Sequence, residues 1–276
     1  MLNESPARGT HPSETMAESI NTSTPLISIV TVVFNALEPL RRTIASVQGQ
    51  DTDNSEHVII DGGSTDGTLE YLNSLAAGRV RWISEPDNGI YDAMNKGLGI
   101  ARGRYVHFLN AGDTFVHPGT LREVEPLLHE SPTILMNRVQ AISSDGSVQR
   151  LLPTTRGLTG AREMFMSAYC HQAAFVRRDA YLAAGGFDDR YRHFADFKAL
   201  WRARALDNRV VETMIEVARF PLDGVSSDWR HAPQLAGERE RLLAELGDPS
   251  SSVVYGMRML KAHLYKLRMM IRHHLR

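Results

Sequence analysis

A short apolar stretch from Tyr105 to Leu109 runs directly into the polar turn Asn110-Ala111-Gly112-Asp113. The apolar run is typical of a buried strand, which would deliver the Asp113 carboxylate to its C-terminal end. Ligands of open α/β sheets collect at those strand ends, and carboxylate oxygens suit hard divalent cations. Asp113 is therefore a candidate ligand for a metal that carries a phosphorylated substrate. The structural alternative is an Asx-type turn that closes the strand.

A second polar turn follows the short apolar run His57 to Ile60, beginning with Asp61-Gly62-Gly63-Ser64. Its two glycines allow a ligand to approach the backbone closely, and residues 64–66 can cap the next helix. Asp61 stands where a ribose or a base could be held. The alternative is an ordinary turn between a strand and a helix.

The elements that must position these residues alternate through the first half of the chain. The expected strands cover 26–34, 57–60, 79–83 and 105–109, and the expected helices cover 37–48, 69–75 and 90–101. This alternation predicts right-handed βαβ units, and therefore an α/β fold with a mostly parallel sheet. The second half mixes strand directions, with a helix over 118–128, a strand over 133–141 and a hairpin turn at 144–147.

Composition excludes several classes of protein. At 276 residues, 42% of them hydrophobic, the chain can bury either one large core or one core with a small appendage. Its net charge of −1 gives no overall attraction to nucleic acid, and no such partner is expected. The single cysteine, Cys170, excludes a disulfide within the chain, so we expect the protein in the cytoplasm. Residues 1–24 are polar throughout and predict a disordered leader.

The glycine pattern excludes the two commonest nucleotide-binding folds. The chain has no Gly-x-x-x-x-Gly-Lys-Ser/Thr, and the turn after its first strand, residues 35–38, has no Gly-x-Gly-x-x-Gly. A P-loop enzyme and a nicotinamide-dependent dehydrogenase are both disfavoured.

Four segments together resemble the family-2 glycosyltransferases of GT-A fold, especially the bacterial enzymes of exopolysaccharide (colanic-acid type) and glycolipid synthesis. They are SIVTVVFN, IDGGSTDGT, EPDNGIYDAMNKG and FLNAGD, at 28–35, 60–68, 85–97 and 108–113. The resemblance implies a GT-A domain over 25–230, with a mixed, mainly parallel sheet flanked by helices. A helical extension over 231–276 would follow it.

The resemblance also implies a nucleotide-sugar donor held across the strand ends. The donor-side positions are Val33, Asn35, Asp61, Asp92, Lys96, Asn110 and Ala111. Asp113 would hold Mg²⁺ or Mn²⁺, which neutralises the diphosphate leaving group. Many relatives carry further acids in this motif, where the chain has Asn110 and Gly112, and an acid after the Asp61 position, where it has Gly62.

Two segments of the second half resemble the acceptor side of the same family. His171 and Gln172 stand in a stretch, 170–178, that resembles the acceptor-side strand. The alternative for His171 is a core histidine hydrogen-bonded to backbone. Asp196 matches the family's catalytic base at the start of a helix, and its alternative is a simple N-cap.

These residues lead us to expect a metal-dependent, inverting glycosyltransferase of the hexosyltransferase type. It would move a sugar from a nucleotide-diphosphate-sugar donor to a hydroxyl of a glycan or lipid-linked acceptor. A nucleotidyltransferase would need a glycine-rich loop bearing Lys or Arg after the first strand, and that loop is absent. A non-catalytic protein that binds sugar nucleotides is the other alternative, suggested by the thin acidic motif.

The C-terminal stretch is basic and periodic. Residues 249–276 contain no acid, and apolar residues recur every three or four positions from Val253 to Leu275. This pattern predicts a basic amphipathic helix over 253–276. Such a helix could bind the inner face of the plasma membrane, pair with a second copy in a homodimer, or dock on the catalytic domain.

Overall fold

The computed structural model describes most of the chain from residue 24 to residue 247. The described residues are 7–8, 24–75, 80–143, 145–151, 161, 165, 169–222 and 232–247. The predicted leader, apart from residues 7, 8 and 24, and the predicted basic helix lie outside them. The predicted domain boundary at 230 also falls outside them and stays a prediction.

Four parallel strands form the half of the sheet that the sequence predicts best. They are β2 (Ile27–Val33), β3 (Ser55–Asp61), β4 (Arg81–Ser84) and β5 (Tyr105–Phe108), in the spatial order β4-β3-β2-β5. The connecting helices are α1 (Leu37–Gln48), α2 (Thr68–Ser74) and α3 (Ile90–Ile100). Each element lies within a few residues of its predicted bounds. All four strands end at the same edge of the sheet because they are parallel.

The sheet continues past β5 with strands of both directions. β9 (Ala174–Arg177) runs antiparallel between β5 and β7 (Ile134–Ile142), and β10 (Val210–Pro221) runs parallel to β7. The short strands are β1 (Ala7–Arg8) on β4, β6 (Thr114–Phe115) on β10, and β8 (Val148–Leu151), which forms the predicted hairpin with β7. The predicted mixed, α/β character is confirmed.

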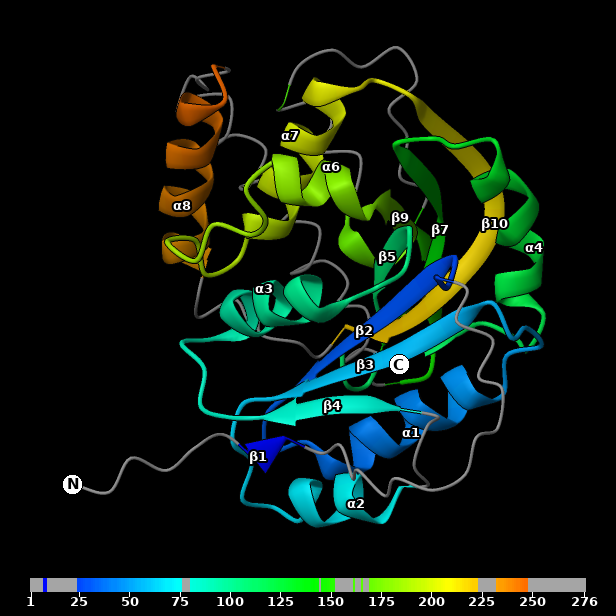
Figure 1. Cartoon of the computed structure of the whole chain (residues 1–276). Coiled ribbons are helices and arrows are strands. Elements are labelled where there is room, and N and C mark those ends of the chain that lie inside the picture. The colour runs from blue at the N-terminus through cyan, green and yellow to red at the C-terminus, as the bar shows by residue number, and fades with distance from the viewer. Residues whose placement is uncertain are drawn as a thin grey trace, which may run out of the picture.

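Helices cover both faces of the sheet. Figure 1 shows α1 and α2 on one face, with α3, α6 (Arg178–Ala183), α7 (Ala195–Leu206) and α8 (Ala232–Glu245) on the opposite side. α4 (Thr120–His129) lies beside β10. No helix in the described part of the chain is long and apolar enough to cross a bilayer.

The alternation of side chains along β3 explains why the sheet has helices on both faces. Val58 and Ile60 join the larger apolar cluster on the α3 side, and Ile59 joins a separate cluster with residues of α1 and α2. α3 approaches so closely that a Cβ at Gly97 would lie 2.4 Å from Val30 Cγ1. Glycine at position 97 therefore allows α3 to pack directly against β2.

The sequence did not predict β10, β6 or α6. β10 contains Glu212, Thr213 and Glu216, and its pairing with β7 shifts register on both sides of Glu216. Bulges of this kind destroy the strict alternation of apolar and polar residues from which a strand is recognised.

Candidate active site

Three strand ends meet at the edge where the sequence places the donor side. Val33 pairs with Asp61 on one flank, and on the other the amide of Ala111 donates to Val32 O at 3.1 Å. Adjacent strands lie about 4.8 Å apart, so the backbones at Asp61 and Ala111 are separated by roughly 10 Å across Val33. The topology therefore brings these predicted donor-side positions together.

Asp61 lies beneath this edge, fully buried. Its carboxylate accepts hydrogen bonds from the Ser64 amide at 3.2 Å and from the Ser84 hydroxyl at 2.6 Å. Ser64 Oγ in turn accepts the Asn35 amide at 2.7 Å. The carboxylate thus connects the turn after β3 to the end of β4 and, through Ser64, to the turn after β2.

The residue just before Asn35 was not predicted to have a role. Phe34 directly follows β2 and has 62% of its surface exposed, which is unusual for a phenylalanine. Asn35 adopts φ of +48°, and its Oδ1 accepts the Thr65 amide at 2.8 Å, so the backbone beside the ring is held in place. An exposed aromatic ring on a braced turn is a surface on which a planar group can stack.

The loop after β4 fills the space beside Gly62. A Cβ at position 62 would lie 2.4 Å from Asp87 Oδ2 and 3.3 Å from Phe34 Cδ2. A larger side chain at position 62 would require the Asp87 carboxylate to move. Gly62 therefore allows the Asp87 carboxylate to reach the donor edge.

Asp92 and Lys96 lie on one face of α3 and hold the same loop. Lys96 Nζ is 3.0 Å from Glu85 Oε1 and 3.6 Å from Asp92 Oδ2, and it donates to Pro86 O at 2.8 Å. Asp92 Oδ2 also accepts the Asn88 amide at 2.9 Å. Both side chains are about one quarter exposed, so the Lys96 ammonium reaches the solvent from an ion pair that it shares with two carboxylates.

The turn from Asn110 to Asp113 is fastened from α1 by Thr43. The buried Thr43 hydroxyl donates to Asp113 O at 2.7 Å and accepts the Gly112 amide at 2.9 Å. Gly112 has φ of +105°, a backbone conformation that favours glycine. This conformation explains why the turn has glycine at position 112, and the two Thr43 hydrogen bonds hold the backbone on both sides of it.

The Asp113 carboxyl is buried, and burial raises its pKa to about 7. His171 and hydrogen bonds from the Asn110 backbone and the Gln172 side chain act in the opposite direction but are outweighed. A raised pKa means that the pocket penalises an uncompensated negative charge. Asn110 Oδ1 is also buried without a hydrogen-bond partner in the described residues. A buried carboxyl with a raised pKa and a carbonyl oxygen without a partner are oxygen ligands of the kind that a hard divalent cation takes.

This pair is not a complete cage. Among the described residues, no group of three or more His, Cys, Asp and Glu side chains is arranged to hold a metal. Mg²⁺ and Mn²⁺ sites in phosphoryl enzymes commonly take one or two protein oxygens, with the rest from substrate phosphates and water. The residues present therefore fit a cation that is completed by the donor.

Asp196 lies at the centre of a chain of hydrogen bonds. Its Oδ2 is 3.0 Å from His171 Nδ1, and its Oδ1 accepts the Tyr91 hydroxyl at 3.2 Å. With its proton on Nδ1, the His171 ring accepts from Asn110 Nδ2 at 3.3 Å through Nε2. The chain of contacts runs from α3 through α7 to the Asp113 turn, and it connects the predicted base to the predicted metal motif.

Both structural alternatives for these residues are wrong. Asp196 is the second residue of α7, and its carboxylate binds side chains of other elements instead of capping the helix. His171 contacts side chains through both ring nitrogens instead of bonding to backbone. Burial and the nearby Asp196 charge raise the pKa of Tyr91 well above 10, so its hydroxyl stays a donor.

One further expectation needs correction, because His171 and Gln172 precede the strand. They stand in a 3-10 turn, η1 (His171–Ala173), and pairing with β7 begins at Ala174. Asn137 Nδ2 donates a hydrogen bond to the Ala173 carbonyl at 3.0 Å, in place of a bond from a neighbouring strand, so the strand's hydrogen-bond ladder ends there. The tight turn directs His171 toward Asp196.

The segment that leads into α7 is held by Asn95 of α3. Asn95 Oδ1 accepts the Phe187 amide at 2.8 Å, and its Nδ2 donates to Phe187 O at 2.7 Å. A Cβ at Gly186 would lie 2.5 Å from Asn95 Oδ1. The glycine pair before Phe187 is the sequence signal for this close approach, although nothing in the sequence named Asn95 as its partner.

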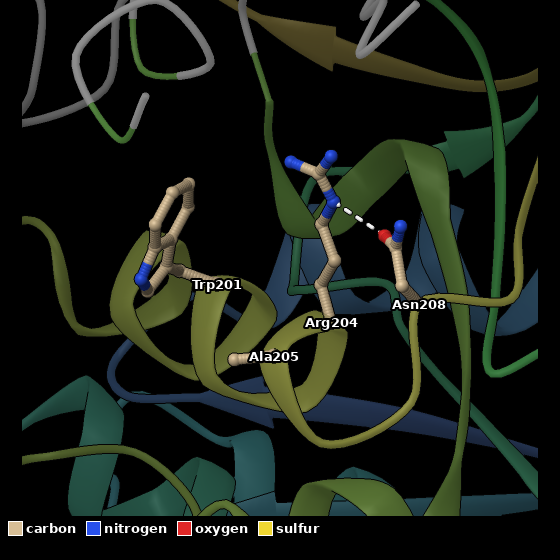
Figure 2. A pocket seen from close by; sticks show the side chains of 4 residues that line it. All are labelled: Trp201, Arg204, Ala205 and Asn208. Carbon is tan, nitrogen blue, oxygen red and sulfur yellow. Dashed lines mark hydrogen bonds between the residues drawn. The ribbon is translucent and has the colours of Figure 1, made fainter. Parts of the chain in front are cut away.

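A hollow at the opposite end of α7 is separate from this constellation. Figure 2 shows Trp201, Arg204, Ala205 and Asn208 around it, with Arg204 Nε donating to Asn208 Oδ1 at 2.8 Å. Asp196 lies in the first turn of α7 and these residues lie in and beyond its last turns. The hollow therefore takes no part in the candidate site.

Comparison with known proteins decides the family. The protein-family model described as glycosyl transferase family 2 matches residues 28–184, more than half of the chain. The chain belongs to glycosyl transferase family 2. Membership makes it a glycosyltransferase and favours glycosyl transfer over nucleotidyl transfer.

Curated relatives agree with this assignment. An uncharacterised glycosyltransferase of Mycobacterium tuberculosis is 31% identical over 88% of this chain and 91% of the relative. A PGL/p-HBAD biosynthesis glycosyltransferase of Mycobacterium bovis is 31% identical over 63% of this chain and 67% of the relative.

Solved structures confirm the predicted GT-A fold. S. aureus TarS 1-349 in complex with UDP-GlcNAc is similar with a TM-score of 0.66, at 15% identity over 83% of this chain and 68% of that chain. The mannosyltransferase PcManGT of Pyrobaculum calidifontis, in complex with GDP-Man and Mn²⁺, gives 0.57 at 18% identity. The match to PcManGT covers 83% of this chain and 66% of the PcManGT chain. The chain spans 42% of the length of the longer TarS structure.

Proposed function

We propose that the protein is an inverting glycosyltransferase that uses a nucleotide-diphosphate-sugar donor and a hydroxyl acceptor on a glycan or lipid-linked glycan. The observation that carries the proposal is the Tyr91-Asp196-His171-Asn110 chain, which joins a braced carboxylate to the turn of Asp113. Two carboxylates with different environments suit two roles, a base on one side and a ligand for the leaving group's counterion on the other. The named relatives and the donors in similar structures support the same reaction class.

In this mechanism Asp196 removes the proton from the acceptor hydroxyl. The freed oxygen attacks the anomeric carbon as the bond from that carbon to the donor diphosphate breaks, and the configuration inverts. His171 and Tyr91 donate to the two carboxylate oxygens, which holds Asp196 in one orientation. A base held in a productive position lowers the entropy cost of this attack.

Asp113 and the unpartnered Asn110 carbonyl would hold a divalent cation, Mg²⁺ or Mn²⁺. When bound there, such a cation would neutralise the negative charge that develops on the departing diphosphate. The donor's base would stack on Phe34, and the Lys96 cation would lie on the side of the strand ends where phosphates collect. Asp61 would act indirectly, by holding the turns through Ser64 and Ser84.

The basic segment 253–276 supports a proposal about location. Its six Lys and Arg residues along an apolar seam would attract an anionic lipid surface, which suits a lipid-linked acceptor. Flotation with vesicles that contain anionic lipid tests this, with Arg268 and Arg272 replaced by Ser as the comparison. Equal flotation of the two proteins would contradict it, and concentration-dependent dimerisation would favour the homodimer instead.

The reaction itself is tested with a panel of donors. Full-length protein is incubated with UDP-glucose, UDP-N-acetylglucosamine or GDP-mannose, each with and without Mn²⁺, and release of the nucleoside diphosphate is measured. We expect release from at least one donor, with the anomeric configuration inverted in the product by NMR. Binding without release from any donor would favour the non-catalytic alternative.

A further inference from the structure

The N-terminus of α7, which carries Asp196, has no cap from its own sequence. The N-cap residue, Phe194, makes no capping bond with its side chain, and Asp196 is committed to His171 and Tyr91. The first amides of a helix lack partners within the helix and need acceptors from elsewhere. A catalytic residue in an uncapped first turn would be poorly held.

Glu238 of α8 supplies an acceptor for the backbone that enters this helix. Its Oε1 accepts the His193 amide at 2.7 Å and the Phe194 amide at 3.2 Å. In a capping box, a glutamate three residues into a helix reaches back to the N-cap amide. Here a glutamate from a different helix, more than forty positions away, takes that place.

A second carboxylate on the same face of α8 holds the next turn of α7. Glu245 Oε1 is 2.5 Å from Nζ of the buried Lys198, and Glu245 Oε2 accepts the Tyr191 hydroxyl at 2.6 Å. Glu238 and Glu245 are seven residues apart, two helical turns, and therefore share a face. α8 thus contacts the chain on both sides of Asp196, at residues 193 and 194 before it and at Lys198 after it.

α8 is itself packed into the hydrophobic core. Leu242 and Leu243 are fully buried and belong to the main apolar cluster. Glu238 is also close enough to contribute to the raised pKa of Tyr91, the other partner of Asp196. These residues of α8 lie beyond 184, where the match to the family model ends.

We propose that Glu238 is a positioning residue for glycosyl transfer, which fixes the first turn of α7 and through it the orientation of the Asp196 carboxylate. The proposal rests on the proposed role of Asp196 as the base. It makes α8 a part of the catalytic unit and not an appendage to it.

Four full-length variants separate the reach of Glu238 from its charge. Glu238→Gln keeps an acceptor oxygen at the same reach, Glu238→Asp keeps the charge but shortens the reach, and Glu238→Ala removes both. Glu240→Ala removes a different carboxylate from the same helix, one that accepts a hydrogen bond from Arg239, and is the control for loss of an acidic side chain from α8.

Turnover of the donor identified by the panel is the first readout. We expect kcat of the Ala variant to fall about 10- to 100-fold with the donor KM within about twofold, since displacement by about 1 Å costs up to this much. Gln should be more active than Asp, and the Glu240→Ala control should match wild type. Higher turnover by Glu238→Asp than by Glu238→Gln, or equal turnover in all variants, would overturn the proposal.

Amide hydrogen exchange of residues 193–197 is the second readout and needs no substrate. Exchange should be faster in Asp and Ala than in Gln and wild type, while exchange in β2 and β3 stays unchanged. Unchanged exchange at 193–197, or faster exchange throughout the molecule, would overturn the proposal. If no donor is turned over by wild type, the proposed function fails, but the exchange result still decides whether Glu238 holds this turn.

Discussion

His171 Nδ1 lies 3.0 Å from Asp196 Oδ2, although the two residues are 25 positions apart and belong to different elements. The contact gives the carboxylate a fixed partner on one oxygen and leaves its other oxygen to the Tyr91 hydroxyl. It also turns the His171 ring so that Nε2 meets Asn110. His171 of the predicted acceptor-side pair and Asn110 of the predicted metal motif, which the sequence presents as separate features, are therefore parts of one network.

Asp196→Asn should abolish transfer while donor binding is retained. An amide cannot take the acceptor proton, and loss of a general base costs about 10²- to 10⁴-fold in rate. Tyr91→Phe, which removes one donor to the same carboxylate but leaves the base, should cost much less. Rates are measured by nucleoside diphosphate release and donor affinity by calorimetry. Wild-type turnover by Asp196→Asn would sink the assignment.

His171→Phe should lower kcat by about 100-fold, the cost of a displaced catalytic group, with little change in donor KM. The informative comparison is the double variant with Asp196→Asn. Because residues that act as a unit give non-additive losses, it should be no slower than Asp196→Asn alone. A further drop in the double variant would show that His171 acts independently of Asp196.

Asp113→Ala should remove Mn²⁺-dependent donor binding, because the remaining Asn110 carbonyl is a weak ligand alone. Calorimetry with and without EDTA measures this, and titration with Mn²⁺ alone gives a readout that needs no turnover. Asp189→Ala, which removes an exposed carboxylate outside the turn, is the control. Equal Mn²⁺ dependence in wild type and Asp113→Ala would show that the ligand lies elsewhere.

Thr43→Val should weaken the same function from a distance. Valine keeps the shape but loses both the donor to Asp113 O and the acceptor for the Gly112 amide, which leaves buried polar groups unpaired at about 1–3 kcal/mol each. We expect lower thermal stability and weaker Mn²⁺-dependent donor binding. Thr43→Ser retains the hydroxyl and should behave like wild type. If Thr43→Ser and Thr43→Val bind the donor equally, the hydroxyl does not hold the turn.

Two buried histidines should make the fold sensitive to acid. Burial lowers the pKa of His57 to about 3 and that of His107 to about 4. Below pH 6.5 these histidines become protonated in the unfolded chain but stay neutral in the folded protein. The free energy of unfolding therefore falls as the pH falls from 6.5 toward their folded pKa values. The slope is about 1.4 kcal/mol per pH unit for each histidine.

His107→Phe tests this pH dependence, because a phenyl ring retains the stacking on Phe175 and Phe115 but does not titrate. Asp113, with its raised pKa, contributes stability below 3.8 that is lost as the pH rises through about 7, so both proteins should carry Asp113→Asn. Urea unfolding between about pH 5 and 7 should then give the His107→Phe protein a slope lower by one histidine. An identical slope in both proteins would contradict the assignment.

The local sequence determined the first half of the fold and the positions of its polar turns. Apolar runs such as those of β2 and β5 are buried on both faces, and the polar residues after them must lie at one edge when the strands are parallel. Asp61, Asn110 and Asp113 could be located in this way, because a strand and the turn after it are continuous in the chain.

Only the tertiary structure decided which groups act on one another. Tyr91 meets Asp196 across 105 positions, and Thr43 meets Asp113 across 70. Glu238 comes from a helix whose charged surface pattern gives no sign of a partner. Periodicity reports which face of an element is buried, but not which element packs against it, and hydrogen bonds between distant segments form only after that packing is chosen. For the same reason the sequence pointed to Asp113 as a candidate metal ligand but not to the Thr43 hydroxyl that holds its turn.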